Sequence, residues 1–175
     1  MKETLVILAH PNLETSTINR RWKEAIEQQL PNVKIRDLYS LYGQNFQIDV
    51  QAEQEACEQA ERIVWQFPFY WYSCPPLLKK WIDDVLTDQW AYGKDGDRLH
   101  GKELLLAFST GSGAERYHRE GRNKYTVEEL IFPFRATSNL IGTTFLPPYY
   151  FNGAYVATEE DIQTSIAHYM ERLRM

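Results

Sequence analysis

The sequence predicts an α/β fold in which a doubly wound parallel sheet of about five strands carries helices on both faces. Three observations lead to this prediction. Short apolar runs alternate along the chain with segments of helical periodicity. Residues 5–9 are apolar throughout, as expected of a strand covered on both faces. Finally, residues 1–175 contain no linker long enough to separate two domains, so we expect a single domain.

The first half of the chain supplies three strands and two helices. After the strand at residues 5–9, apolar side chains four apart predict an amphipathic helix over 18–30. Residues 33–38 alternate and suit a strand nearer the sheet edge, and residues 51–60 form a helix rich in alanine and glutamate. Residues 62–67 return as a strand.

The second half continues the alternation. Pro75 and Pro76 suit the first turn of a helix that buries an apolar face up to Val85. Residues 104–108 are the fourth strand, and residues 143–146 the last, ending before a proline pair. Residues 126–129 and 158–161 have capping-box spacing, each ahead of a helix.

Composition excludes several function classes. The net charge of −5, with scattered Lys and Arg, disfavours a nucleic-acid partner. The two cysteines have no metal-ligand spacing, so neither a disulfide framework nor a metal site is expected. The chain has no run of about 18 apolar residues, and its N-terminal apolar stretch is too short for a signal peptide. We therefore expect a cytoplasmic protein without a membrane span.

Ligands of such a sheet gather at the carboxyl ends of the strands, where three loops carry suitable groups. Residues 66–73 (QFPFYWYS) concentrate aromatic side chains that could stack on a flat ligand such as a flavin, or could merely cap the core. Residues 9–19 lead into a helix N-terminus that favours a phosphate, although a plain polar helix cap explains them equally well. Residues 108–118 contain the string STGSG, whose amides can bind an anion or simply form a turn.

The chain resembles the flavodoxin-like NAD(P)H:quinone oxidoreductase superfamily, and within it the ancillary flavoproteins of glutathione-regulated potassium-efflux systems. The matching phrases span nearly the whole chain in order. They are Ala9-His10-Pro11, residues 16–19, Asp37-Leu38-Tyr39 with Ile48-Asp49, residues 63–66, Trp71-Tyr72-Ser73, residues 75–79, residues 90–93, His100-Gly101-Lys102 and Leu146-Pro147-Pro148.

The resemblance implies a flavodoxin-like fold, a non-covalent FMN, and two-electron ping-pong reduction of quinones or related electrophiles by NADPH or NADH. FAD is less expected, because the FAD-using relatives carry an extra C-terminal region. By similarity, the first loop would hold the phosphate and ribityl chain, the second one side of the flavin ring, and the third its pyrimidine end. The residues concerned are His10, Ser16, Thr17, Ile18 and Asn19; Pro68, Phe69, Tyr70, Trp71 and Tyr72; and Ser109, Thr110, Gly111, Ser112 and Gly113.

Tyr117 and His118 are the candidate catalytic residues. Tyr117 has the spacing of a catalytic tyrosine in the larger quinone reductases, but the histidine that accompanies it there falls on Asn123 here. His118 is adjacent and could substitute, or could be a solvated loop residue. Neither the physiological acceptor nor the preference between NADPH and NADH follows from the sequence, and five arginines could contact a 2′-phosphate: Arg20, Arg21, Arg116, Arg119 and Arg122.

The resemblance also leaves a second class of function open, that of a regulatory subunit bound to the cytoplasmic face of a potassium–proton antiporter, which would place the chain beside the inner membrane through its partner. A one-electron flavodoxin-like carrier fits less well, because the aromatic loop would then have no purpose. Relatives are dimers, so a homodimer is expected. Residues 90–92 and 149–151 are candidates for that contact, although they could equally pack within one chain.

Overall fold

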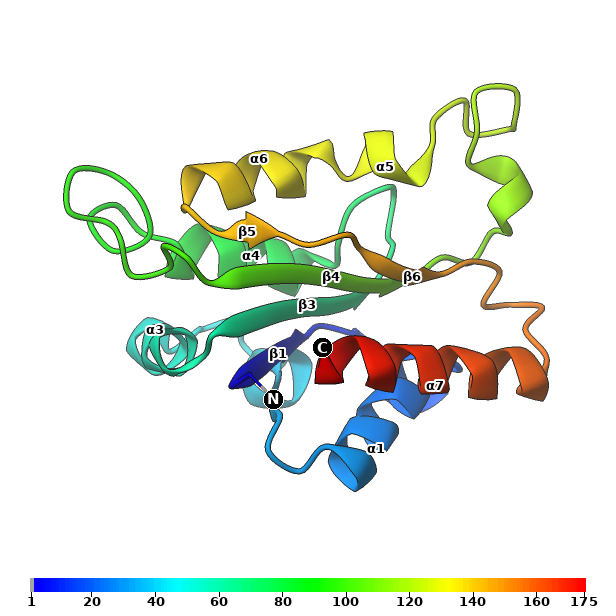
Figure 1. Cartoon of the computed structure of the whole chain (residues 1–175), viewed down its shortest axis with the longest axis horizontal. Coiled ribbons are helices and arrows are strands. Elements are labelled where there is room, and N and C mark those ends of the chain that lie inside the picture. The colour runs from blue at the N-terminus through cyan, green and yellow to red at the C-terminus, as the bar shows by residue number, and fades with distance from the viewer. Residues whose placement is uncertain (1) are drawn as a thin grey trace.

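The computed structural model describes residues 2–175 and has a parallel sheet between two helical layers (Figure 1). The strand order is β2-β1-β3-β4-β5, and every pair is parallel. This confirms the predicted α/β sheet. The bounds are β1 Thr4–Leu8, β2 Lys34–Asp37, β3 Arg62–Pro68, β4 Glu103–Ser109 and β5 Thr144–Phe145.

The fifth position of the sheet is filled by two short strands instead of the one predicted over 143–146. After β5, a further strand, β6 (Tyr149–Phe151), pairs with the later half of β4. The ladder is interrupted at Pro147 and Pro148, which have no N–H to donate. The strand position therefore ends at Phe151 and not at Leu146.

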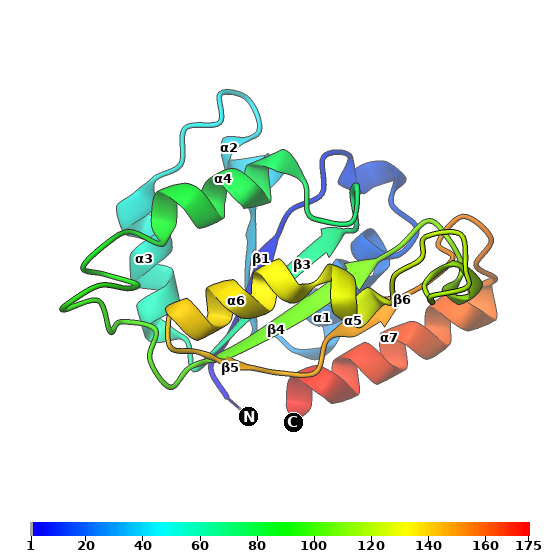
Figure 2. The same ribbon diagram turned by 90° about the horizontal axis from the view of Figure 1, so that it is seen from above.

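The two helical layers lie on opposite faces of the sheet (Figure 2). Helices α1 (Asn19–Gln29) and α7 (Glu159–Arg174) pack against each other on one face. The other face carries the remaining helices, several of them short. They are α2 (Leu38–Tyr42), α3 (Val50–Gln59), α4 (Pro76–Val85), α5 (Val127–Leu130) and α6 (Phe132–Leu140), while single 3-10 turns lie at η1 (Leu13–Thr15) and η2 (Ala114–Arg116).

Helix starts follow the predicted capping chemistry. Thr126 with Glu129 and Thr158 with Asp161 each form a complete capping box at the first turn of α5 and α7. The helix expected after Thr126 is broken at Ile131, because Pro133 enters the first turn of α6 and cannot continue the hydrogen-bond ladder of α5. Each capping box therefore marks where its helix begins.

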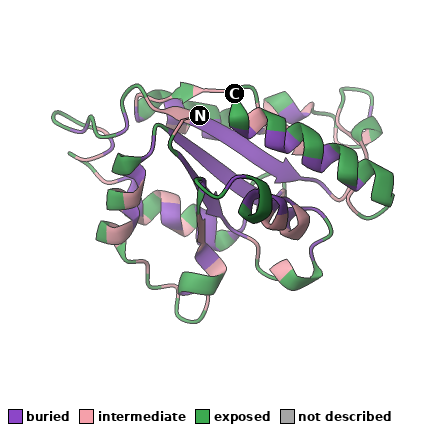
Figure 3. Ribbon diagram, turned by 60° about the horizontal axis from the view of Figure 1, so that its bottom comes forward, coloured by how far each residue is buried: buried purple, intermediate pink, exposed green. Residues whose placement is uncertain are grey.

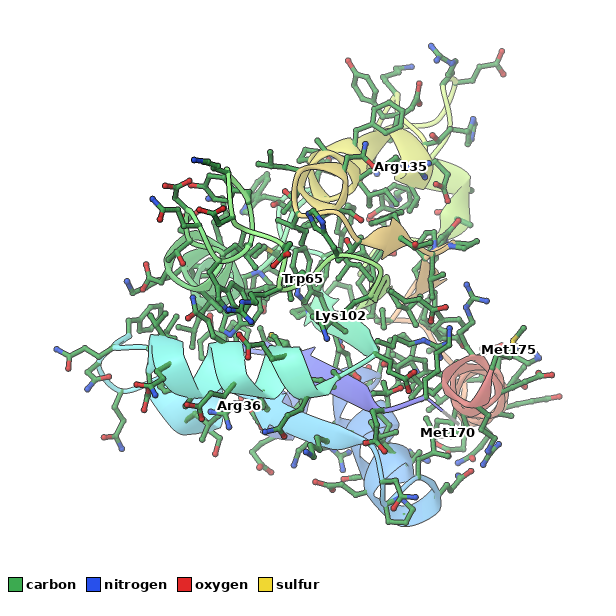
Figure 4. All side chains as sticks on the ribbon, turned by 60° about the vertical axis from the view of Figure 1, so that its left-hand side comes forward. Arg36, Trp65, Lys102, Arg135, Met170 and Met175 are labelled. Carbon is green, nitrogen blue, oxygen red and sulfur yellow. The ribbon has the colours of Figure 1, made fainter. Side chains whose placement is uncertain are left out.

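A separate apolar core lies between each face of the sheet and the helices that cover it. Figure 3 shows the central strands buried and the outer faces of the helices exposed. Trp65 belongs to the core beneath α4 and α6, where its ring meets those of Trp81 and Phe134 at 6.3 and 6.1 Å. Met170 belongs to the core between α1, α7 and the sheet, so the two labelled residues lie on opposite sides of the strands (Figure 4). With both faces covered, ligands can approach the sheet only at its edges and strand ends.

The parallel strands bring four loops to one end of the molecule. β1 lies between β2 and β3, so the direction of winding reverses between β1 and β3 and leaves a crevice at their carboxyl ends. The loops after β3, β4 and β6 reach this same end, which lies at the right in Figure 1. Within residues 2–175, every helix is too short or too polar to cross a bilayer.

Candidate functional site

Two adjoining cavities open at the carboxyl end of the sheet. The smaller cavity has a volume of about 350 Å³ and the larger about 750 Å³, and Phe69, Gly111 and Tyr155 line both. The smaller is also lined by His10, Thr15, Ser16, Thr17, Ile18, Pro68, Tyr70, Ser109 and Ala154. The larger is also lined by Trp71, Tyr72, Ser112, Gly113, Glu115, Arg116, Tyr117 and Val156. Most of the predicted site residues therefore meet here.

The first loop gives the smaller cavity a set of hydrogen-bond donors. The Asn12 N–H donates to His10 Nδ1 at 3.2 Å, which leaves the proton of the neutral ring on Nε2. Burial lowers the pKa of His10, so the neutral ring is favoured. Ser16 Oγ accepts from the Asn19 N–H at 3.0 Å and so satisfies the first N–H of α1, while the N–H groups of Thr17 and Ile18 have no partner within residues 2–175. The start of α1 therefore presents free N–H donors to the smaller cavity.

Asn19 and Thr110 lie behind the cavities and line neither. Asn19 is fully buried: its Nδ2 donates to Ser109 Oγ at 2.9 Å and its carbonyl accepts from Gln66 Nε2 at 3.1 Å. Tyr169 in turn donates to Gln66 Oε1 at 3.1 Å. This network fixes α1 against β3, β4 and α7, and it leaves Asn19 Oδ1 as a buried acceptor without a partner. Such an atom usually has a ligand or water to satisfy it.

The aromatic loop ends in a strained turn. Tyr70 and Ser73 exchange backbone hydrogen bonds of 3.1 and 2.9 Å, and the two residues between them, Trp71 and Tyr72, have φ of 48° and 62°. The left-handed conformation costs an ordinary residue about 1–2 kcal/mol. The turn holds the Trp71 side chain 92% exposed at the mouth of the larger cavity, while Phe69 stacks on Phe108 at 4.9 Å. Strain of this kind is typical of ligand-binding turns.

The third loop supplies backbone donors at the junction of the cavities. Thr110 is buried and its Oγ1 lies 2.7 Å from Ser112 O, which holds the loop in place. The N–H groups of Gly111, Ser112 and Gly113 have no partner within the described residues and are free to donate. A short glycine-containing segment with several free N–H groups is suited to an anion or an acceptor-rich ring edge.

A fourth loop, after β6, completes the site and was not predicted. Ala154 N donates to Thr110 O at 2.9 Å, Gly153 N donates to Ser112 O at 2.8 Å, and Thr17 Oγ1 donates to Ala154 O at 3.3 Å. These bonds fix the loop to the first and third loops. Its Tyr155 ring lies against Gly111, where a Cβ would fall 2.4 Å from Cε2 of that ring.

Of the two candidate catalytic residues, Tyr117 and His118, only the first lines a cavity of the site. Tyr117 lines the larger cavity near Phe69, and burial raises the pKa of its hydroxyl. His118 is exposed and lines neither cavity. Asn123 accepts a hydrogen bond of 3.2 Å from the Tyr72 hydroxyl and so links the aromatic turn to the loop that follows Tyr117. Tyr117 is therefore the one of the pair with access to a ligand.

These features fit a flavin mononucleotide. The free N–H groups at the start of α1 suit its phosphate. The aromatic walls and the free amides at residues 111–113 suit its ring.

A model of the flavodoxin-like fold family matches residues 2–173. General stress protein 14 of Bacillus subtilis is 53% identical over 96% of this chain and 97% of its own. The NAD(P)H oxidoreductase YrkL of the same organism is 48% identical over 98% of each. The chain belongs to the flavodoxin-like NAD(P)H oxidoreductases. It is an oxidoreductase, and the superfamily resemblance is confirmed.

Other members of these flavodoxin-like oxidoreductases differ in name. The potassium-efflux ancillary protein KefF of Salmonella arizonae is 44% identical over 97% of this chain and 94% of its own. Among solved structures, general stress protein 14 of Treponema denticola, in complex with FMN, is 40% identical over 98% of each chain with a TM-score of 0.93. An NADPH-quinone reductase of P. pentosaceus is 34% identical over 97% of this chain and 96% of its own, with a TM-score of 0.88.

A structure described as a thermophilic tryptophan halogenase is 47% identical over 97% of each chain, with a TM-score of 0.93. That halogenase is from Streptomycin violaceusniger. These proteins are similar to this chain over nearly its whole length, but their names state different activities and roles.

Proposed function

We propose that the chain is an FMN-dependent NAD(P)H oxidoreductase that reduces quinones or related electrophiles. The observation that carries this is the pair of joined cavities. One has the free N–H groups of a helix start, and the other has aromatic walls and remains open beside the same backbone junction at Gly111. A phosphate-bearing flavin suits the first cavity and the junction, and the second leaves room for another planar ligand.

The cofactor would be held by residues of three loops. His10, with its proton on Nε2, and the N–H groups of Thr17 and Ile18 would bind the phosphate. Phe69 and the neighbouring aromatic side chains would contact the ring. One relative supports the choice of FMN, because the Treponema denticola structure is a complex with it.

When bound, FMN supplies two-electron hydride chemistry, in which one donor and one acceptor use the ring in turn. The larger cavity would admit both in succession, so ping-pong kinetics are expected. The free N–H groups of residues 111–113 would stabilise negative charge at the pyrimidine end of the ring. The Tyr117 hydroxyl, kept neutral by its raised pKa, would donate a hydrogen bond or a proton to the acceptor oxygen.

The test is the visible absorbance of the purified protein with and without added FMN, followed by NADPH and then menadione in the absence of oxygen. Binding of FMN, bleaching by NADPH and recovery with menadione are expected. A bound flavin that NADPH leaves oxidised would contradict the reductase reaction. Failure to bind FMN at all would contradict the site as well.

The similarity to KefF favours a second role beside the first. In this alternative the chain acts in the cytoplasm as the ancillary subunit of a potassium–proton antiporter, next to the inner membrane through that partner. Co-purification of the chain with an antiporter encoded in the same genome, and a change in potassium efflux when the chain is removed, would support this role. Unchanged efflux in its absence would exclude it.

A further inference from the structure

One wall of the larger cavity carries a cation that no carboxylate holds closely. Arg116 lies in the turn η2, and its side chain is 43% exposed. Its nearest carboxylate is that of Glu115, the preceding residue, where Nε and Oε1 are 3.6 Å apart. Within residues 2–175 the guanidinium donates no hydrogen bond of ordinary length. Its donors are therefore available to a ligand in the cavity.

The other arginines near the site are occupied or turned elsewhere. Arg20 pairs with Glu24 and Arg21 with Glu159, both at 2.7 Å, and Arg119 pairs with Glu129 at 2.5 Å. Arg122 is exposed and lines neither cavity. Of the five arginines that could meet a phosphate, Arg116 is the one that lines either cavity of the candidate site.

The main chain of Arg116 is fixed although its side chain is not. Its N–H donates to Gly113 O at 3.2 Å, and its carbonyl accepts from the Asn123 N–H at 3.1 Å. The guanidinium is thus carried by a positioned turn, on the wall that continues from the free amides of Gly113. A fixed backbone reduces the entropy lost when the side chain engages an anion.

The anion at Arg116 has to belong to a second ligand. The flavin phosphate is expected at the start of α1 in the smaller cavity, which Arg116 does not line. A nicotinamide dinucleotide offers a pyrophosphate in either form and a 2′-phosphate only in NADPH. The 2′-phosphate is a monoester with a charge near −2 and three free oxygens, which matches a single half-exposed guanidinium better than the singly charged oxygens of a pyrophosphate.

We propose that Arg116 binds the 2′-phosphate of NADPH and gives the chain a preference for NADPH over NADH. This inference rests on the proposed function, because it assumes that the larger cavity admits the hydride donor. Glu115 lies beside the same position and opposes the phosphate. Removing the charge of Arg116 and removing that of Glu115 should therefore have opposite effects on the preference for NADPH over NADH.

The first test compares kcat/KM for NADPH and for NADH, at fixed menadione, in the wild type and in Arg116→Gln. The value for NADPH is expected to fall about tenfold to a hundredfold, and the value for NADH much less, because only NADPH loses a charged hydrogen-bond partner. Glu115→Gln is expected to raise the ratio of NADPH to NADH severalfold. Arg122→Gln removes the same charge outside both cavities and is expected to leave the ratio unchanged.

A binding measurement supports the kinetics without turnover. Calorimetric titration of the FMN-loaded protein with adenosine 2′,5′-bisphosphate and with 5′-AMP should show that Arg116→Gln weakens only the former. Absorbance of bound FMN checks that the variant is folded.

The outcomes separate the two proposals. Wild-type protein that binds FMN but oxidises neither dinucleotide contradicts the proposed function. Wild-type turnover with an unchanged ratio in Arg116→Gln contradicts only the role of Arg116. An equal loss with NADPH and NADH places the pyrophosphate at Arg116 and overturns the 2′-phosphate assignment.

Discussion

At the scale of single residues, we expect the turn at Trp71 and Tyr72 to lower the stability of the fold and to contribute to FMN binding. Trp71 is almost fully exposed, so its ring contributes little to the core, while its φ of 48° is costly for any residue except glycine. We expect Trp71→Gly to raise the free energy of unfolding of the FMN-free protein by about 1 kcal/mol, as measured by urea denaturation. The same variant should bind FMN about fivefold more weakly, because an aromatic contact worth about 1 kcal/mol is lost.

Two further variants separate these effects. Trp71→Ala removes the ring and keeps the unfavourable φ, so it should lose FMN affinity without the gain in stability. Tyr125→Gly changes an exposed aromatic residue whose φ is not positive and should lower stability. Unchanged FMN affinity in both Trp71 variants would show that the turn does not contact the flavin.

The hydroxyl of Tyr117 is expected to assist reduction of the acceptor. Tyr117→Phe should lower the rate of quinone reduction at least tenfold while the bound FMN and the rate of reduction by NADPH stay the same. Burial raises the pKa of Tyr117 above the usual value near 10. The hydroxyl therefore stays protonated at every pH below about 10. The contribution of Tyr117 should therefore be constant from about pH 6 to about pH 9. Full turnover in the Phe variant would exclude a proton-transfer role.

At the scale of secondary-structure elements, the start of α1 is expected to distinguish FMN from riboflavin. The two ligands differ only in the phosphate, which we place at His10 and the free N–H groups of Thr17 and Ile18. His10→Ala should weaken FMN binding about tenfold, as measured by quenching of flavin fluorescence, because one donor to a charged group is lost. Riboflavin binding should hardly change. An equal loss for both flavins would place the phosphate elsewhere.

The regular elements were predictable because their signals are local. Buried strands in a doubly covered sheet are apolar throughout, and the capping boxes at Thr126 and Thr158 fix the helix starts. The short helix α2, whose cap is Asp37 at the end of a predicted strand, was not predicted, and neither were two interruptions. These are the break at Ile131 and the division of the fifth strand, both of which depend on how a proline is accommodated by its neighbours.

Three of the four loops of the site were predicted from one rule, that ligands gather at the carboxyl ends of parallel strands. The fourth loop, with Ala154 and Tyr155, was missed for a traceable reason. The sequence predicts a last strand that ends at Leu146, whereas β6 extends the same strand position of the sheet to Phe151. The same rule, applied to the true strand end, would have found Tyr155. Which of the predicted residues line a cavity depends on side-chain direction and required the structure.

At the scale of the whole molecule, apolar side chains gather around the mouth of the site. Trp71, Tyr155 and Val156 line the larger cavity and are 92%, 91% and 82% exposed. Residues 90–92 and 149–151, the candidates from the sequence for a contact between chains, largely pack within this one: Ala91 is buried, and Tyr149 stacks on Tyr169 at 5.2 Å. An exposed apolar group beside a binding site is typical of an interface.

We therefore expect a homodimer in which a second copy packs against Trp71, Tyr155 and Val156 and leaves the larger cavity open to the hydride donor and the acceptor. Light scattering coupled to size exclusion should give the mass of two chains at micromolar concentration. Val156→Arg places a charge in the apolar group without touching the phosphate-binding loop, and it should yield the mass of one chain with FMN still bound at reduced affinity. Glu171→Arg on the exposed surface of α7 is the matched control and should remain a dimer. A single-chain mass for the wild type would contradict the dimer, and a dimeric Val156→Arg variant would move the interface away from the mouth of the site.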